Sequence, residues 1–347
     1  MRSLGIGLML MAVAACGGGN RVAGDGDDGD DDGPEDAAVA PDAGPTPVRF
    51  VVLGDTGEGN QAQRDVATAM KTVCDAAGGC DFALLLGDNI YDDGVTGTDD
   101  MQWQTKFEQP YAALNIPFYA VLGNHDYGGQ IIIPVPGVGN EWDKGPIEVM
   151  YTEVSDKWEM PATHYTFTVG NVGIIALDTN SIVWGNLEHG DQRAWYPSAL
   201  AEVADADWKI VAGHHPYRSN GTHGNAGDYD APEIAGIPIP NPLPIVGGGE
   251  IKTFFDEVVC GTVDLAFAGH DHNRQWLDES ERCGGTELIV SGAGAKLTEY
   301  RDRGNRTHFM NHDEEGFLFV EVVGKRLTGR FYGKDGGMDF ERTLTKP

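Results

Sequence analysis

The chain has 347 residues, which is enough for one large hydrophobic core or two smaller ones. It carries 54 acidic and 24 basic side chains, and its net charge at pH 7 is −30. Because a surface of this sign repels phosphate backbones, we expect no nucleic acid partner. An enzyme of this charge that acts on an anionic substrate needs a local positive site, which metal ions would supply.

Residues 1–16 have the pattern of a bacterial export signal. Arg2 gives a positive start, and residues 4–15 form an apolar run that is too short to span a membrane. The run ends at Val13-Ala14-Ala15-Cys16, which resembles the lipobox of bacterial lipoproteins, where the cysteine is lipidated and becomes the new N-terminus. We therefore expect an exported lipoprotein that is anchored to a membrane through Cys16, in the periplasm or at the cell surface. An ordinary signal peptide with a chance cysteine is the alternative.

Residues 17–47 form a stretch rich in Gly, Asp, Ala and Pro, with nine acidic residues and one basic residue. Such a stretch cannot bury enough apolar surface to offset its chain entropy, so we expect a disordered linker. Calcium binding by residues 25–32 is the alternative. The tethered domain is then expected to span residues 48–347, as a monomer.

Four cysteines remain after Cys16 is set aside, and an even number in an exported chain indicates two disulfides. Three pairings are possible. The local pairing joins Cys74 to Cys80 and Cys260 to Cys283. Buried free thiols are the alternative.

Short apolar runs that stop at a glycine followed by a polar residue recur along the chain, and they indicate buried strands. These runs are residues 49–53, 82–86, 118–122, 209–212 and 264–268. Segments with the composition of helices lie between several of these runs, at residues 61–74, 101–114, 193–204 and 250–259. Further strands are predicted at residues 164–169, 172–177, 287–291, 317–323, 326–332 and 340–344, the late ones as an antiparallel meander. Together these elements predict an α/β fold with two packed mixed β-sheets flanked by helices.

Each of the five runs leads to a side chain that can bind a metal ion. These side chains are Asp55, Asp88, Asn124, His125, His214 and His270. Taken singly, each is explained as well by a plain turn or a structural histidine. The ends of such strands usually meet at one edge of a sheet, and Asp, Asn and His suit iron, zinc or manganese. The combination therefore predicts a metal site.

Five segments resemble the motif blocks of purple acid phosphatases, which share most of these blocks with other calcineurin-like metallophosphoesterases. The segments are Gly54-Asp55-Thr56-Gly57, Gly87-Asp88-Asn89-Ile90-Tyr91, Gly123-Asn124-His125-Asp126, Val211-Ala212-Gly213-His214 and Gly269-His270-Asp271-His272. Tyr91, three residues after Asp88, is the feature that favours purple acid phosphatases. The resemblance covers nearly all of residues 48–332 and is greatest to the small, mammalian-type tartrate-resistant enzymes. It implies the αββα metallophosphoesterase sandwich.

The resemblance also implies a site for Fe(III) and one divalent ion, either iron, zinc or manganese. The implied Fe(III) ligands are Asp55, Asp88, Tyr91 and His272. Asp88 would bridge to the divalent ion, whose other implied ligands are Asn124, His214 and His270. The implied reaction is hydrolysis of a phosphate monoester by a metal-bound hydroxide, because two bridged cations clamp the attacking and leaving oxygens of an in-line displacement.

Two further histidines, His125 and His223, are implied to orient the phosphate and protonate the leaving alkoxide. A purely structural imidazole is the alternative for each, and His215 is expected to shape the pocket. The chain departs from the small mammalian-type members at Thr56, where they usually have Trp. The segments 131–147 and 219–249 are predicted to be long loops, with residues 237–244 extended.

The sequence therefore predicts a dinuclear acid phosphatase that acts on phosphate monoesters outside the cytoplasm. A phosphodiesterase or nucleotide hydrolase of the broader calcineurin-like group is the alternative, because the long loops leave the rim of the site open. A non-catalytic binding protein on the same scaffold would lack at least one ligand, and all seven implied positions are filled.

Overall fold

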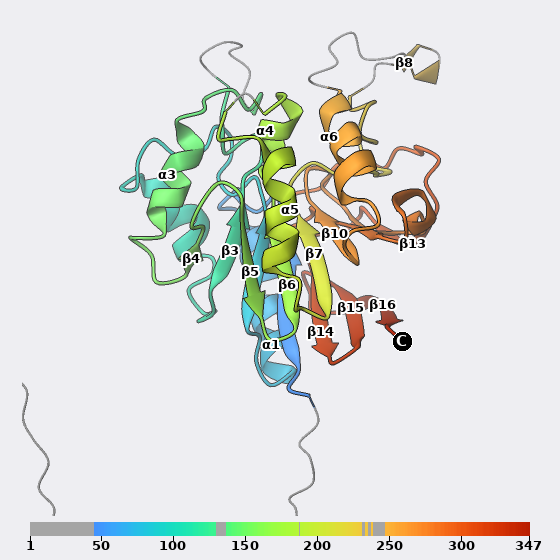
Figure 1. The fold of residues 1–347 in the computed structure, drawn as a ribbon. Helices are drawn as coiled ribbons and strands as arrows, with labels where there is room; N and C mark the ends of the chain where they lie inside the picture. The colour runs from blue at the N-terminus through green and yellow to red at the C-terminus, as the bar shows by residue number, and fades with distance from the viewer. Residues whose placement is uncertain (1–44, 130–136, 187, 231–232, 235–236, 239–246) are drawn as a thin grey trace, which may run out of the picture. The chain divides into compact units, whose positions relative to one another are not determined.

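The structure is a computed structural model that describes residues 45–129, 137–186, 188–230, 233–234, 237–238 and 247–347. The predicted signal peptide with Cys16, and residues 17–44 of the predicted linker, lie outside the described residues. The described chain forms two seven-stranded sheets and a two-stranded ribbon (Figure 1). Within the described residues, no helix is both long and apolar enough to cross a membrane.

The first sheet has the strand order β16-β15-β14-β1-β2-β3-β4. Its parallel part consists of β1 (Val48–Leu53), β2 (Phe82–Leu86), β3 (Phe118–Val121) and β4 (Trp158–Glu159). An antiparallel meander joins it at β1 and consists of β14 (Gly316–Val323), β15 (Arg326–Gly333) and β16 (Met338–Thr345). The predicted late meander is thus confirmed for these three strands.

The second sheet has the order β13-β11-β12-β10-β7-β6-β5. Its parallel strands are β6 (Val172–Ala176), β7 (Trp208–Ala212), β10 (Leu265–Ala268) and β12 (Glu287–Ser291). The antiparallel strands are β5 (Tyr165–Val169), β11 (Arg274–Leu277) and β13 (Thr307–Asn311). The separate ribbon pairs β8 (Glu233–Ile234) with β9 (Ile237–Pro238).

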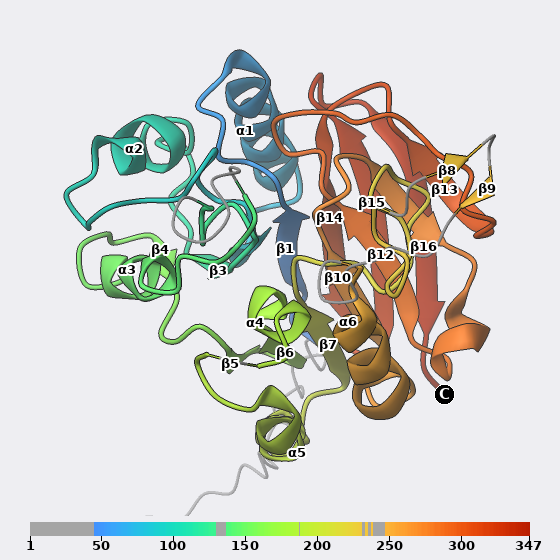
Figure 2. The same cartoon turned by 90° about the horizontal axis from the view of Figure 1, so that it is seen from above.

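The main hydrophobic core contains buried side chains from strands of both sheets, among them Phe50, Leu84, Ile174 and Ile210. Viewed from above in Figure 2, α1 (Gln61–Ala76) lies on one side of the strands. The helices α5 (Gln192–Glu202) and α6 (Gly249–Phe254) lie on the other side, where a second apolar cluster packs them against sheet residues such as Val211. The predicted sandwich of two mixed sheets flanked by helices is confirmed.

The remaining helices are short. They are α2 (Met101–Trp103), the π-helix η1 (Gln104–Glu108), α3 (Lys144–Tyr151), α4 (Thr179–Val183), the π-helix η2 (Phe255–Val259) and the 3₁₀-helix η3 (Ser280–Cys283). The helix predicted over residues 101–114 therefore ends early, because Pro110 has no backbone N–H with which to continue the helical hydrogen bonds, and the chain goes on as turns. The loop predicted over residues 131–147 is also shorter than expected, since α3 begins at Lys144.

Strand pairing differs from the prediction in the second sheet. The strand β12 was expected among the late antiparallel strands, but it pairs in parallel with β10. Its antiparallel neighbour β11 has the polar sequence Arg-Gln-Trp-Leu, which gives no apolar run to detect. Both predicted disulfides are present: Cys74 pairs with Cys80, and Cys260 with Cys283.

Candidate metal centre

Three of the predicted ligands have left-handed backbone directly after a strand and a glycine. The φ angle is 59° at Asp55, 52° at Asp88 and 68° at His270. Residues with a Cβ rarely adopt this conformation, and it persists where surrounding contacts hold it, often at functional sites. The turn after each of these strands therefore directs a polar side chain to the edge of the sheet.

Glycines let the strand ends of the two sheets approach each other. Gly87 has a φ of 84°, and a Cβ on it would lie 2.7 Å from the amide nitrogen of Gly123 and 2.8 Å from Nδ1 of His214. A Cβ on Gly269 would lie 2.7 Å from Oδ2 of Asp55. The Gly-Asp and Gly-His motifs thus allow side chains from separate sheets to meet.

All seven predicted ligands meet in one connected cluster. The phenol oxygen of Tyr91 is 3.0 Å from Oδ1 of Asp55, 2.8 Å from Oδ2 of Asp88 and 3.3 Å from Nε2 of His272. The Nε2 atom of His214 is 3.0 Å from Oδ1 of Asn124, 3.1 Å from Nδ1 of His270 and 3.4 Å from Oδ2 of Asp88. Metal–ligand bonds of about 2.1 Å place neighbouring ligand atoms roughly 3.0–3.4 Å apart, so these spacings fit a metal coordination shell.

Asp88 lies in the middle of the cluster. Its Oδ2 atom contacts Tyr91 on one side and His214 on the other. Asp55 also contacts His272 at 3.3 Å on the Tyr91 side. The ligand atoms of Asp55, Asp88 and His214 all lie within 4.8 Å of one another, and the three residues are buried. Asp88 thus lies between the Tyr91 side and the His214 side of the cluster.

The hydrogen bonding of His214 shows why a cation fits here. Its Nδ1 atom is 2.8 Å from the carbonyl oxygen of Leu86, so it donates its proton there. In the neutral imidazole Nε2 then presents a lone pair, and that lone pair faces the oxygens of Asn124 and Asp88. The amide nitrogen of Asn124 is already used, because it donates to the carbonyl of Gly137 at 2.7 Å. A metal ion bound between these atoms would replace the proton on Nε2, because the lone pairs of His214, Asn124 and Asp88 would then all face the ion.

Burial and neighbouring charges set the ionisation of these groups. Burial opposes ionisation of Asp88, but His214 and His125 outweigh it and hold the pKa of Asp88 well below its usual value. Burial raises the pKa of the Tyr91 phenol, and the carboxylates of Asp55 and Asp88 raise it further. Burial also lowers the pKa of His270, and the neighbouring histidines add to this effect. Asp88 is thus a carboxylate and His270 a neutral imidazole, which are the forms that bind metals. Burial lowers the pKa of His214, but Asp88 and Asp55 outweigh it and raise that pKa to about 9, so His214 and Tyr91 would each release a proton when a metal ion binds.

A second layer of side chains holds the ligand loops, and the sequence did not reveal their roles. The buried Asp126 carboxylate accepts bonds from the backbone amides of Asn89 at 2.7 Å and Gly123 at 2.8 Å. The Thr179 hydroxyl accepts from the amide of His214 at 3.1 Å. Asp271 accepts from the amide of His223 at 2.8 Å. Within the motif blocks, Asp126 directly follows the predicted catalytic residue His125, and Asp271 directly follows the predicted ligand His270. This adjacency is the signal that the sequence offers for their roles.

The two predicted catalytic histidines flank the cluster. Nδ1 of His125 is 2.6 Å from the carbonyl oxygen of Asp92, and its ring lies 4.5 Å from the ring of Tyr91. Nδ1 of His223 is 2.8 Å from Oδ1 of Asp230, and its ring lies 4.1 Å from the ring of His270. In both residues Nε2 is therefore the nitrogen left for a substrate. No sequence pattern indicated Asp230 as the partner of His223.

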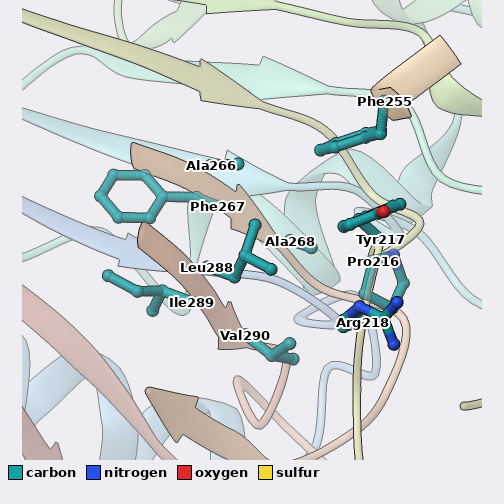
Figure 3. Close-up of a pocket in the computed structure, with 10 residues that line it drawn as sticks. All are labelled: Pro216, Tyr217, Arg218, Phe255, Ala266, Phe267, Ala268, Leu288, Ile289 and Val290. Carbon is teal, nitrogen blue, oxygen red and sulfur yellow. The ribbon is translucent and has the colours of Figure 1, made fainter. Parts of the chain in front are cut away.

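A hollow of about 340 Å³ adjoins the cluster. Its lining is Asn124, His125, Gly137, Val138, Asn180, Val183, Trp184, His215, His223, Tyr229, Asp230 and His270. The predicted pocket role of His215 is consistent with this position. A second hollow, between Tyr217, Phe255 and the strands β10 and β12 (Figure 3), has a volume of about 10 Å³ and holds no more than about one water molecule. The hollow beside the cluster is therefore the candidate substrate pocket.

The sequence model of the calcineurin-like phosphoesterase family matches residues 48–274, which is more than half of the chain. The chain belongs to this family. All seven residues of the cluster fall within the matched range, and so do His125 and His223. The comparison does not test which of them binds metal, and their ligand roles stay predictions.

Curated relatives of this phosphoesterase are acid phosphatases. Tartrate-resistant acid phosphatase type 5 of Mus musculus is 27% identical over 339 residues, covering 87% of this chain and 92% of the mouse protein. Purple acid phosphatase 4 of Arabidopsis thaliana is 26% identical over 304 residues, covering 83% of this chain and 81% of the plant protein. The predicted resemblance to purple and tartrate-resistant acid phosphatases is confirmed.

Solved structures share the fold. A Plasmodium protein described as GAP50, the anchor in the inner membrane complex, has a TM-score of 0.63 and 23% identity, covering 86% of this phosphoesterase and 89% of that chain. The purple acid phosphatase PPD1 of yellow lupin (Lupinus luteus) has a TM-score of 0.61 and 17% identity, covering 87% and 54%. At these identities the likeness concerns the fold alone.

Proposed function

We propose that this phosphoesterase is a dinuclear acid phosphatase that hydrolyses phosphate monoesters outside the cytoplasm. The observation that carries the proposal is the single cluster of seven side chains, in which Nε2 of His214 lies 3.0 Å from Oδ1 of Asn124 and 3.4 Å from Oδ2 of Asp88. The similarity to acid phosphatases over most of the chain supports it.

Two metal ions fit the donor set. Asp55, Tyr91 and His272 would hold Fe(III), because phenolate and carboxylate oxygens are hard ligands that suit a trivalent ion. Asn124, His214 and His270 would hold iron, zinc or manganese as the divalent ion, and Asp88 would join the two. When bound, the cations would supply positive charge for the phosphate oxygens and lower the pKa of a water molecule that becomes the nucleophile.

The two histidines beside the cluster would orient the phosphate and protonate the leaving oxygen. Because Nδ1 of His125 donates to the Asp92 carbonyl, its Nε2 atom is left to face the phosphate. Nδ1 of His223 donates to Asp230, which favours the protonated imidazole and leaves the proton on Nε2 for the leaving oxygen. This division of roles makes His223 the general acid and His125 an orienting group.

A phosphodiesterase or nucleotide hydrolase is the second candidate. The described lining of the pocket contains no Lys or Arg, and its one carboxylate, Asp230, is paired with His223. Apart from His223, such a lining offers no cation to a second phosphate group, which disfavours nucleoside di- and triphosphates as substrates. The comparison of monoester and diester hydrolysis below distinguishes the remaining classes. The fold by itself does not decide activity, since it is shared with a protein described as a membrane-complex anchor. The complete ligand set here favours an enzyme.

The location outside the cytoplasm is part of the proposal. Residues 1–16 would act as an export signal, Cys16 as the lipid attachment site and residues 17–47 as an acidic spacer. The two disulfides support an oxidising compartment. Labelling with a radioactive fatty acid would test the anchor, and a Cys16→Ser variant that still labels would contradict it.

The decisive experiment for the activity combines metal analysis with hydrolysis of phenyl phosphate and bis-phenyl phosphate across pH. We expect about two metal ions per chain, one of them iron, and faster hydrolysis of the monoester at acidic pH. Preferential hydrolysis of the diester would favour the second candidate, and a metal-loaded protein without either activity would contradict both.

A further inference from the structure

A lysine lies against the ring of Tyr91. The Nζ atom of Lys296 is 3.2 Å from the centroid of the Tyr91 ring, well within the reach of a cation–π contact. The same ammonium group is 2.8 Å from Oε1 of Glu58. Lys296 lies five residues after the end of β12, and none of the five motif blocks contains it.

Backbone contacts fix the position of Lys296. The amide of Gly294 donates to the carbonyl of Gly54 at 3.0 Å. The side-chain amide of Asn60 donates to the carbonyl of Ala295 at 2.9 Å. The segment before the lysine is therefore tied to the loop that follows β1 and carries Asp55. The lysine side chain is 26% exposed, so its contact with the ring is made at the rim of the site.

Two carboxylates lie beside the phenol oxygen of Tyr91, and a positive charge near the ring offsets their effect. Its phenol oxygen lies 3.0 Å from Asp55 and 2.8 Å from Asp88, and two carboxylates at these distances oppose negative charge on the phenol. A second lysine, Lys106, donates to the backbone carbonyl of Tyr91. Negative charge on a phenol oxygen spreads into the ring, so the ammonium group of Lys296 over the ring face attracts it.

We propose that Lys296 is a positioning residue of the metal centre. Its ammonium group holds the Tyr91 ring and stabilises negative charge on it, so that Tyr91 binds a trivalent ion more tightly. This inference rests on the proposed role of Tyr91 as an iron ligand. It assigns a function to a residue of this chain that lies outside the ligand set.

The inference predicts a spectral shift with a definite sign. Charge transfer from a tyrosinate to Fe(III) moves an electron out of the phenolate ring. A positive charge over the ring stabilises the electron-rich ground state more than the electron-depleted excited state, which raises the energy of the absorption band. Removing the charge of Lys296 should therefore move the band to longer wavelength.

The test uses the full-length protein and the variants Lys296→Met, Lys296→Arg and Glu58→Gln. With Fe(III), we expect the visible band of Lys296→Met at longer wavelength and that of Lys296→Arg close to the unmodified protein, because a guanidinium group also stacks on aromatic rings. Glu58→Gln, which removes the anion paired with the ammonium group, should shift the band to shorter wavelength. With Ga(III) as the probe, tyrosinate difference absorption should show about three- to tenfold weaker binding by Lys296→Met.

Lys346→Met is the matched control. Lys346 lies 4.9 Å from the Trp208 ring at the start of β7, so its removal takes away a similar lysine–aromatic contact at the opposite end of a strand from the cluster. We expect no change in band position or Ga(III) affinity. Thermal unfolding of each variant identifies any variant that is not folded. If Lys296→Met does not fold, Glu58→Gln still tests the inference, because it retains the lysine and changes only its partner.

The outcomes separate this inference from the proposed function. An unchanged band and unchanged Ga(III) affinity in a folded Lys296→Met variant would overturn the role of Lys296 alone. If the unmodified protein shows no tyrosinate band with either Fe(III) or Ga(III), then Tyr91 is not a metal ligand and the role of Lys296 is overturned as well. This conclusion would hold even if the protein hydrolysed phosphate esters. The expected shifts in a protein without phosphatase activity would support Lys296 and contradict the proposed function.

Discussion

The side chains of His223 and Asp230 are joined through Nδ1 and Oδ1 at 2.8 Å, and the backbone amide of Asp230 donates back to the carbonyl of His223 at 3.0 Å. Asp230 has a φ of 50°, in the left-handed region that residues with a Cβ rarely adopt. These two bonds hold the imidazole in one tautomer. Burial opposes protonation of His223, but Asp230 and Asp271 outweigh it and raise the pKa of the imidazole.

Asp230→Asn should narrow the pH range of activity on its alkaline side. His223 serves as an acid only below its pKa, and loss of the Asp230 charge lowers that pKa, so activity should fall away at lower pH than in the unmodified enzyme. At pH 7 we expect a rate loss of about tenfold, smaller than the loss of about 10²-fold or more expected for His223→Ala. The kcat–pH profile is the measurement, with exposed Asp228→Asn as the control. An unchanged alkaline limb would remove Asp230 from the mechanism.

Asp88→Ala should abolish activity and metal binding together, because the central carboxylate contacts both halves of the cluster. The loss should exceed the roughly 100-fold that removal of an outer partner of a metal ligand causes. Metal content by mass spectrometry and hydrolysis of phenyl phosphate measure the two effects. The exposed Asp75→Ala on α1 should behave like the unmodified protein. Full metal content in Asp88→Ala would show that the cluster is not the metal site.

Trp184→Ala should weaken discrimination between leaving groups. Trp184 and Val183 form part of the apolar wall of the pocket, and Trp142 packs edge-on against Trp184 with a centroid separation of 6.2 Å. Loss of the indole should lower kcat/KM for phenyl phosphate about tenfold, since burial of an aromatic leaving group is worth on the order of 1.5 kcal/mol.

The same variant should change kcat/KM for glycerol 3-phosphate by less than about twofold, because a small polar leaving group buries little apolar area there. Trp195→Ala, in a tryptophan that packs in the second apolar cluster, is the control. An equal loss with both substrates would indicate a structural role for Trp184 instead.

Asp178 should make stability depend on pH. This buried carboxyl accepts a bond from the Tyr127 hydroxyl at 2.6 Å and caps α4 by accepting from the amide of Ser181 at 3.0 Å. Burial nevertheless raises the pKa of Asp178 from 3.8 to about 6. Because the folded state holds this proton more tightly than the unfolded state, its contribution is full below pH 4 and is lost as pH rises through about 6.

Asp178→Asn should remove this dependence, since an amide does not titrate in this range. The free energy of unfolding of the unmodified protein, relative to the variant, should fall by on the order of 3 kcal/mol between pH 4 and pH 7. Urea titrations at several pH values measure it. A constant difference between the two proteins would show that Asp178 is ionised throughout.

The strand ends were predictable because their signals are local. A buried strand, a glycine and a polar residue stand next to one another in the sequence, so Asp55, Asp88 and His270 could be identified without knowledge of the fold. The backbone conformation that the motif needs is set by the same few residues, as the left-handed φ angles show. Their ligand roles stay predictions until metal is measured.

Other parts of the fold were not predictable in this way. The strand β12 has the same apolar character as the meander strands, and only its pairing with β10 assigns it to the other sheet. Pairing depends on the path of the connecting segments, which no short window of sequence contains. The helix from Met101 is also shorter than its composition predicts, because Pro110 has no backbone N–H to continue it.

The sequence alone determined the disulfide spacing, the sandwich of two sheets and the set of polar residues that follow the strands, because each depends on neighbours in the chain or on composition. Only the tertiary structure decided that Asp230 partners His223, that Trp184 faces the pocket and that Lys296 covers the ring of Tyr91. Lys296 and Tyr91 are separated by most of the chain, and their contact exists because the loops after β1, β2 and β12 meet at one edge of the sandwich.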